Sequence, residues 1–403
     1  MRSIKPHLTP IFEHNQINEK NLVESDGVFI DSFFELRKQM AQLACANSDF
    51  ILFFRGQKRD YTDNLYRKGG SSFFPSIYRG NISDEDLHEK WTKLEIACKL
   101  FAEKIRSYKE SLPKKSNERK ELDIVLKKIL LQWSILQHYE VTDTPLLDVT
   151  QSLRVACSFA FLDSQEEYSY IYAFGLPYNT GRISINSEHY LTNIRLISIA
   201  PSGSLRPHYQ EGFLVGEDEI NEREKKNITL DFRRRLIGKF RIPNNDSFWK
   251  STTNTESFEE NLIERGLTKK ELYLDLNNHD DIIAKICNLV KEEMSDLNES
   301  EKYISQNPFE GFMFVWKQIE SGLRDVYGIM HDNSKFSALK AIRFIQDKEL
   351  RDKLNRLRIW RNNLVHGGVD TREIPENINT ALLILKELQD YLNSPTMVIQ
   401  CNS

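Results

Sequence analysis

The 403-residue sequence has little cysteine, little net charge and no long apolar run, and each shortage excludes a class of protein. Its five cysteines lie far apart with no C-x-x-C pair, which argues against a zinc ribbon or a disulfide framework and for a reducing compartment. A formal net charge of -4 means that any nucleic-acid contact must come from a local patch. No apolar run approaches the roughly 20 residues that cross a bilayer, and the first residues lack the apolar core of a signal peptide. We therefore expect a cytoplasmic protein with no membrane partner.

The sequence also has no internal repeat, no low-complexity tract and neither a GxGxxG nor a P-loop sequence. Its hydrophobic content of 40% and charged content of 28% are ordinary for a globular protein. The length favours two domains, because a single core rarely grows beyond about 300 residues.

The first 290 residues mix helical and strand-like patterns. Residues 50–54 predict a buried strand that ends at Arg55 and Gly56. Thr150 is placed to cap a helix. The other expected elements are helices at 83–111 and 118–139 and strands at Tyr170–Leu176, Ile194–Ala200, Gly212–Val215 and Leu236–Ile242. This mixture indicates an α+β fold rather than a regular βαβ series.

The composition changes after about residue 290. The acidic, polar segment 291–306 predicts a linker or an exposed helix, and every element beyond it has a helical pattern. One apolar stripe consists of Phe312, Val315, Trp316, Ile319, Leu323 and Val326. We therefore expect an N-terminal extension at 1–29, an α+β domain at 30–290, the linker, and an all-α helical bundle at 307–403.

The segment Arg361–His366 near the end of a helical run places a permanent cation five residues before a group that titrates near neutral pH. Arginine can hold a phosphate, while histidine can take a proton from a ribose 2′-hydroxyl or give one to a leaving 5′-oxygen. Asn362 could orient either group, and Arg356 and Arg358 could hold an RNA backbone. The structural alternative pairs Arg361 with an acidic neighbour and leaves His366 to cap its helix.

This segment and the surrounding bundle resemble the HEPN superfamily, whose ribonuclease members carry an arginine, four to six residues, and a histidine. Arg361 and His366 fit this spacing, and Asn362 matches the asparagine common after the arginine. The resemblance implies catalysis by Arg361, His366 and Asn362 without a metal or other cofactor. It also implies a homodimer, because that family builds its cleft from two copies of the motif.

Three segments in order resemble the FRG domain, named for its Phe-Arg-Gly signature. They are Phe54-Arg55-Gly56-Gln57, then Gln137-His138-Tyr139 with Leu146–Thr150, Ser152 and Ala156, and then Tyr209–Phe213. The stretch Leu272–Leu276 resembles the closing segment of the family, so the resemblance covers about 30–290. Two departures occur, because Glu140 stands where the family usually has glycine and the turn 141–145 is one residue longer.

The order of polar residues in this region is similar to that of ADP-ribosyltransferases, in which an arginine holds NAD, a hydroxyl supports the ribose and a glutamate stabilises the transition state. Here Arg55, then Thr150 or Ser152, and then Gln210 would take those places, and Gln210 is a weak substitute because it is neutral. Gln57, His138 and Asp148 complete the expected pocket. Two alternatives to turnover of NAD are a pocket that only binds a nucleotide and a structural cluster with Arg55 paired to Asp148.

Both resemblances point to families found in bacterial phage defence and toxin systems. We therefore expect a sensor–effector protein in which a nucleotide pocket, for NAD or another nucleotide, regulates a metal-independent endoribonuclease. An alternative is an NAD-dependent ADP-ribosyltransferase or NAD hydrolase whose bundle only dimerises. Another is a non-enzymatic binding module that joins a larger complex through an antitoxin or a phage protein.

Overall fold

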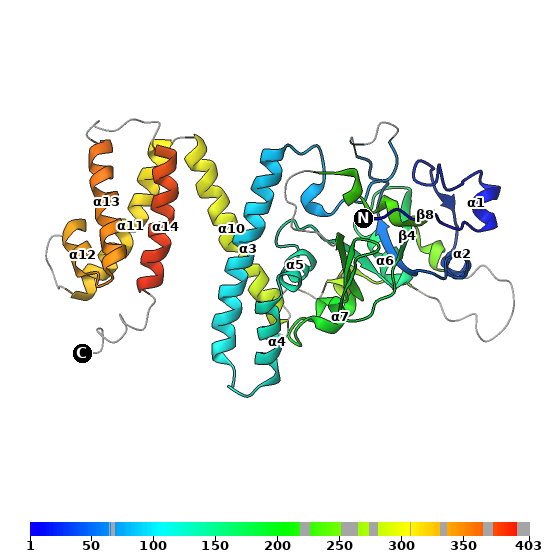
Figure 1. Cartoon of the computed structure of the whole chain (residues 1–403), viewed down its shortest axis with the longest axis horizontal. Coiled ribbons are helices and arrows are strands. Elements are labelled where there is room, and N and C mark those ends of the chain that lie inside the picture. Colours follow the sequence, from blue (N-terminus) through cyan, green and yellow to red (C-terminus); the bar gives the residue numbers. More distant parts are fainter. Residues whose placement is uncertain are drawn as a thin grey trace. The chain divides into compact units, whose positions relative to one another are not determined.

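The computed structural model describes residues 1–63, 65, 69–217, 226–250, 265–273, 281–306, 308–330, 337–365 and 374–392. The chain forms two compact units, Met1–Lys291 and Glu292–Ser403. The first unit contains a mixed sheet with helices, and the second is helical (Figure 1). Among the described residues, no helix is both long enough and apolar enough to cross a membrane.

The first unit is built around one sheet whose eight described strands run in the order β1-β8-β4-β2-β3-β7-β6-β5. The strands are β1 (Val28–Phe29), β2 (Ile51–Gln57), β3 (Leu147–Thr150), β4 (Tyr168–Leu176), β5 (Ile183–Asn186), β6 (Leu191–Ile194), β7 (Gly212–Glu217) and β8 (Leu236–Pro243). Neighbouring strands pair antiparallel, except that β1 runs parallel to β8. The expected N-terminal extension is part of this unit, since Phe12 and Leu22 are buried in its core.

The helices of this unit cover parts of the sheet and pack on one another. They are α1 (Pro10–His14), α2 (Phe33–Ala46), α3 (Asp84–Ser111), α4 (Asn117–Lys127), α5 (Ile129–His138), α6 (Leu153–Phe161), α7 (Leu196–Ile199), α8 (Arg206–Tyr209), α9 (Lys269–Leu272) and α10 (Ile282–Gln306), which crosses the unit boundary. Short 3-10 turns lie at Ser76–Tyr78, Ile228–Leu230, Phe232–Arg235 and Asp246–Trp249. Helix α3 packs against α4 and α5, and α6 packs against β2 (Figure 1).

Three local predictions need correction. The helix expected at 118–139 is divided at Lys128, whose backbone is extended. The prediction of a strand at 194–200 is wrong. Strand β6 pairs with β5 and β7 only as far as Ile194, and the chain then forms α7. The cap of α6 is Ser152, whose hydroxyl accepts a hydrogen bond from the Val155 amide, and not Thr150.

Side chains along β2 alternate between the two faces of the sheet, as they must in a strand. Phe54 and Gly56 face α6, and the α-carbon of Gly56 lies so close that an added Cβ would be 1.8 Å from the Ala156 carbonyl oxygen. Arg55 and Gln57 therefore point to the opposite face. That face is partly covered by Phe73, which makes edge contacts with rings on β4.

The second unit contains α11 (Pro308–Met330), α12 (Ala338–Phe344), α13 (Lys348–Val365) and α14 (Ile374–Leu392). The predicted apolar stripe of α11 is buried, from Phe312 to Val326, together with Leu354 of α13 and Leu388 of α14. The segment 291–306, expected as a linker or an exposed helix, forms the C-terminal part of helix α10.

Candidate functional site

Strands β2 and β3 of the sheet in the first unit diverge from each other. These strands share one residue pair, Phe54 with Thr150, among the described residues, whereas β2 and β4 pair along all of Ile51–Gln57. A cavity of about 720 Å³ opens at this split and is lined by residues of both strands. Its size is within the 300–1,000 Å³ that is usual for sites that take a small molecule.

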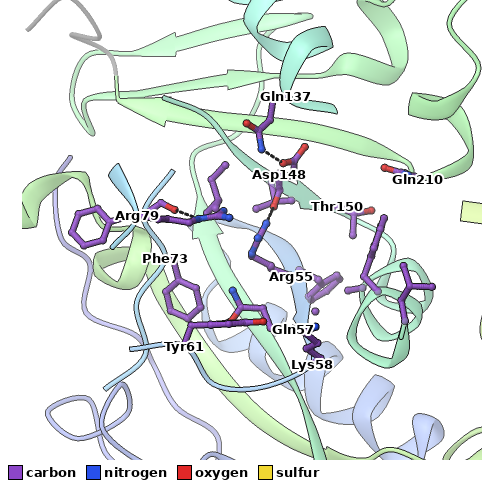
Figure 2. A pocket seen from close by; sticks show the side chains of 18 of the residues that line it. Arg55, Gln57, Lys58, Tyr61, Phe73, Arg79, Gln137, Asp148, Thr150 and Gln210 are labelled. Carbon is purple, nitrogen blue, oxygen red and sulfur yellow. Dashed lines mark hydrogen bonds between the residues drawn. The ribbon is translucent and has the colours of Figure 1, made fainter. Parts of the chain in front are cut away.

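Arg55 lies at the centre of this cavity wall (Figure 2). Its Nη1 donates a hydrogen bond of 2.6 Å to the backbone carbonyl oxygen of Asp148, while its Nε is buried without a partner among the described residues. Burial, reinforced by the nearby charge of Arg79, lowers the pKa of Arg55 to about 10. A carbonyl thus orients this guanidinium, and the nearby Asp148 carboxylate offsets only part of the effect of burial on its pKa.

Arg79 is held in the same way. Its Nε donates to the backbone carbonyl of Phe74 at 3.0 Å, and Figure 2 shows its guanidinium pointing toward Asp148 and Arg55. Burial against the protein lowers the pKa of Arg79, although part of the side chain remains exposed at the cavity. Two cations therefore converge on one region, which favours an anionic ligand.

Asp148 provides the carboxylate of this region. It accepts a hydrogen bond of 2.8 Å from Nε2 of Gln137, and its Oδ1 lies 3.6 Å from Nδ1 of buried His138. Burial alone would raise the pKa of Asp148, but His138, Arg55 and Gln137 outweigh it and lower the pKa. His138 also packs tightly against Gly212, where an added Cβ would be 2.8 Å from the ring.

The other expected pocket residues divide into two groups. Gln57, Thr150 and Gln210 line the cavity. The side-chain Oε1 of Gln57 is buried without a partner among the described residues. The Thr150 hydroxyl donates to the Glu211 backbone carbonyl at 3.1 Å, and the Gln210 side-chain amide donates to the Leu272 backbone carbonyl at 2.9 Å. Ser152 is not part of the cavity lining, because its hydroxyl caps α6.

A scan against family models gives one match, the FRG domain, over residues 51–169. The chain contains an FRG domain. Its Phe-Arg-Gly signature is the part of β2 just described, in which arginine lines the cavity and glycine admits α6. No curated protein and no solved structure matches the chain.

Several lining residues of the FRG cavity escaped the sequence analysis. Arg79, Tyr61 and Phe73 come from loops between β2 and α3, Glu140 follows α5, and Tyr273 follows α9. The one available signal was the departure at Glu140, where the FRG family usually has glycine. No group of three or more histidine, cysteine, aspartate or glutamate side chains is placed to hold a metal in the part of the chain that the structure describes.

In the helical unit, Arg361 lies on α13 with its guanidinium 5.8 Å from the centre of the Trp316 ring. It donates to Asn362 Oδ1 at 3.1 Å, and its Nε is buried without a partner among the described residues. Arg358 bonds to Asn355 on the same helix, and Arg356 is exposed. His366 lies outside the described residues.

Proposed function

We propose that the FRG domain binds a nucleotide through its phosphates and acts as the ligand-sensing part of this protein. The observation that carries the proposal is Arg55, whose side chain is fixed by a backbone carbonyl while its Nε has no partner among the described residues at the cavity. A buried donor without a partner costs free energy, and a bound phosphate oxygen would supply the partner.

The charges around the cavity support a phosphate ligand. Two of the lining carboxylates are neutralised, Asp63 by Lys226 at 2.6 Å and Asp163 by Lys269 at 2.6 Å. Arg55 and Arg79 are instead held by backbone carbonyls and lie near one carboxylate, that of Asp148, so two cations face one anion and positive charge remains in excess for a ligand. A planar guanidinium matches the oxygens of a phosphate, and two of them suit a diphosphate.

Calorimetric titration of the full chain with pyrophosphate, ADP, NAD and adenosine tests this proposal. We expect ADP, NAD and pyrophosphate to bind, adenosine not to bind, and Arg55→Ala to weaken binding about 100-fold, as loss of charge-assisted hydrogen bonds should. Equal binding by the wild type and Arg55→Ala would contradict it.

A second candidate for the same cavity is transfer or hydrolysis at NAD. It is favoured by the presence of Arg55, Thr150 and Gln210 in one lining, and it is weakened by the bond that ties neutral Gln210 to the Leu272 carbonyl. Incubation with labelled NAD decides between binding and turnover. Nicotinamide release or label transfer that Arg55→Ala abolishes would establish turnover, whereas intact NAD would leave the sensor function alone.

We also propose that the helical unit is a HEPN-like, metal-independent endoribonuclease, active as a homodimer. Arg361 supports this because no described carboxylate pairs with it, in contrast to the ion pair of the structural alternative. Arg361 would hold the scissile phosphate while His366 takes the 2′-hydroxyl proton. The 2′-oxygen then bonds to phosphorus, the bond to the 5′-oxygen breaks, and a proton passes to that oxygen. Inertness toward RNA and NAD, with a stable co-purifying protein, would favour a binding module instead.

A further inference from the structure

Glu140 has a backbone conformation that favours glycine. Its φ of 56° is in the left-handed region, directly after the C-cap of α5. Its amide bonds to the Gln137 carbonyl at 2.9 Å, and the amide of Val141 bonds to the Leu136 carbonyl at 2.8 Å. This is the Schellman ending of a helix, in which glycine is usual at this position. A glutamate here costs stability, because its Cβ crowds the backbone.

The side chain of Glu140 is exposed and lines the cavity. The hydroxyl of Tyr273 donates to its Oε1 at 3.2 Å. Tyr273 is itself held from behind by Arg206, whose guanidinium lies 4.9 Å from the ring centre and donates to the His138 carbonyl at 3.0 Å. The carboxylate is therefore positioned at the cavity by a supported tyrosine, and it retains acceptor capacity because a carboxylate accepts several hydrogen bonds.

We propose that Glu140 recognises the 2′- and 3′-hydroxyls of the ribose of a nucleotide held by Arg55. This inference rests on the proposed nucleotide site and adds a specificity-determining residue to it. A carboxylate in a cavity with two guanidiniums repels the phosphates and attracts donors, and adjacent ribose hydroxyls are two donors that a carboxylate can accept. Acidic side chains bind ribose hydroxyls in this way in dinucleotide-binding folds. One nucleotide carries both groups close together, within a cavity of about 720 Å³.

The test is a cycle of two proteins and two ligands. ADP and 2′,3′-dideoxy-ADP are titrated into the full chain as wild type and as Glu140→Gln, which keeps the shape of the side chain. Relative to ADP with the wild type, we expect about 10-fold weaker binding for dideoxy-ADP with the wild type and for ADP with Glu140→Gln, which is the effect of one or two hydrogen bonds. Dideoxy-ADP with Glu140→Gln should bind little more weakly than either, because both changes remove the same interaction. Pyrophosphate should bind Glu140→Gln as well as or better than the wild type, because a repelling charge is removed.

The outcomes separate this inference from the proposed function. If pyrophosphate and ADP do not bind the wild type, both fail. If they bind and Glu140→Gln leaves the preference for ADP over dideoxy-ADP unchanged, ribose recognition fails while the phosphate site stands. Equal weakening of all three ligands would assign Glu140 to neutralising Lys291 and Arg206, the cations whose charges act near it, and would also overturn the inference.

Glu140→Gly gives an independent readout. Glycine relieves the backbone strain, so we expect the melting temperature of the ligand-free protein to rise by about 2 °C while affinity for ADP falls. Tyr273→Phe is the matched control, because it removes the hydroxyl that holds the carboxylate and leaves the backbone unchanged. It should weaken ADP binding less than Glu140→Gln does. A drop in melting temperature for Glu140→Gly would contradict the strain argument.

Discussion

Arg55 and Arg361 are the two arginines on which the proposed activities depend, and each has a buried Nε without a partner among the described residues. They differ in how they are held. Arg55 donates a hydrogen bond to the backbone carbonyl of Asp148. Arg55 itself lies on β2, the strand that α6 approaches closely at Gly56. Arg361 is held by side chains, the amide of Asn362 and the ring of Trp316. The first arrangement is rigid because backbone defines it, and the second can adjust by changes of rotamer.

Substitution of one glycine in each unit should expose a difference in how tightly the two units are packed. At Gly56 a Cβ would be 1.8 Å from the Ala156 carbonyl oxygen, whereas at Gly322 of α11 it would be 3.0 Å from the flexible end of Leu388. We expect Gly56→Ala to lower the free energy of unfolding of the first unit by about 3 kcal/mol and Gly322→Ala to change stability far less. Thermal melting measures both. Gly181→Ala, where the nearest atom is 3.6 Å away, should change stability by less than about 0.5 kcal/mol.

Sequence reasoning found the parts of the molecule that local patterns determine. The stripe from Phe312 to Val326 is buried as predicted, because helical periodicity places those side chains on one face. The FRG signature likewise identified Arg55. The signature did not determine the partner of Arg55. The sequence is the same whether Arg55 pairs with the carboxylate of Asp148 or donates to its backbone carbonyl, and the structure shows the second.

The remaining cavity residues could not be predicted for a physical reason. Arg79, Tyr61 and Tyr273 reach the cavity from loops whose paths depend on tertiary packing rather than on periodicity. Thr150 and Ser152 are both suitable caps for α6, and the choice of Ser152 depends on the point where β3 ends. The proposed roles of Arg361, Asn362 and His366 stay predictions, because His366 lies outside the described residues.

A large effect on activity is expected in the helical unit. Arg361→Ala should lower cleavage of single-stranded RNA in the presence of a chelator about 1,000-fold, because the scissile phosphate loses its fixed cation. Arg356→Ala is the control, because this exposed arginine is proposed only to hold the RNA backbone. It should raise KM and reduce the dependence on salt while kcat is retained. Cleavage that survives in both Arg361→Ala and His366→Ala would exclude the assignment of catalysis to these two residues.

Arg55 offers a test in which binding and stability move apart. Folding lowers its pKa to about 10, so the folded chain holds this proton less tightly than the unfolded chain, and the charge destabilises the fold at every pH below about 10. Arg55→Met removes this cost together with one hydrogen bond to the Asp148 carbonyl. We therefore expect it to lose about 100-fold in ADP affinity while its stability at pH 7 changes little.

Arg235 is the matched control for Arg55, because burial also lowers its pKa to about 10. Its Nε instead donates to the Gly175 carbonyl at 2.8 Å and its Nη1 to the Arg2 carbonyl at 3.3 Å. Arg235→Met should lose stability, because two carbonyls lose their donors, and it should retain ADP affinity. A large stability loss in Arg55→Met would show that Arg55, like Arg235, is a structural arginine.

The smallest effect concerns the carboxylate beside Arg55. The pKa of Asp148 is lowered from its usual value of 3.8 in the folded chain, so its ionised form stabilises the fold above that value. Asp148→Asn should cost about 0.5–1 kcal/mol at pH 7, a modest loss because solvent screens a carboxylate that is 37% exposed. The difference in unfolding free energy between Asp148→Asn and the wild type should vanish as the pH falls below 3.8 and through the lowered pKa of the folded chain, because the carboxylate is then protonated. Denaturant titrations at several pH values can follow this change. Arg361 has no described carboxylate partner, so Arg361→Ala should show no such loss of its stability difference in acid. If it did, Arg361, like Arg55, would lie beside an ionised carboxylate.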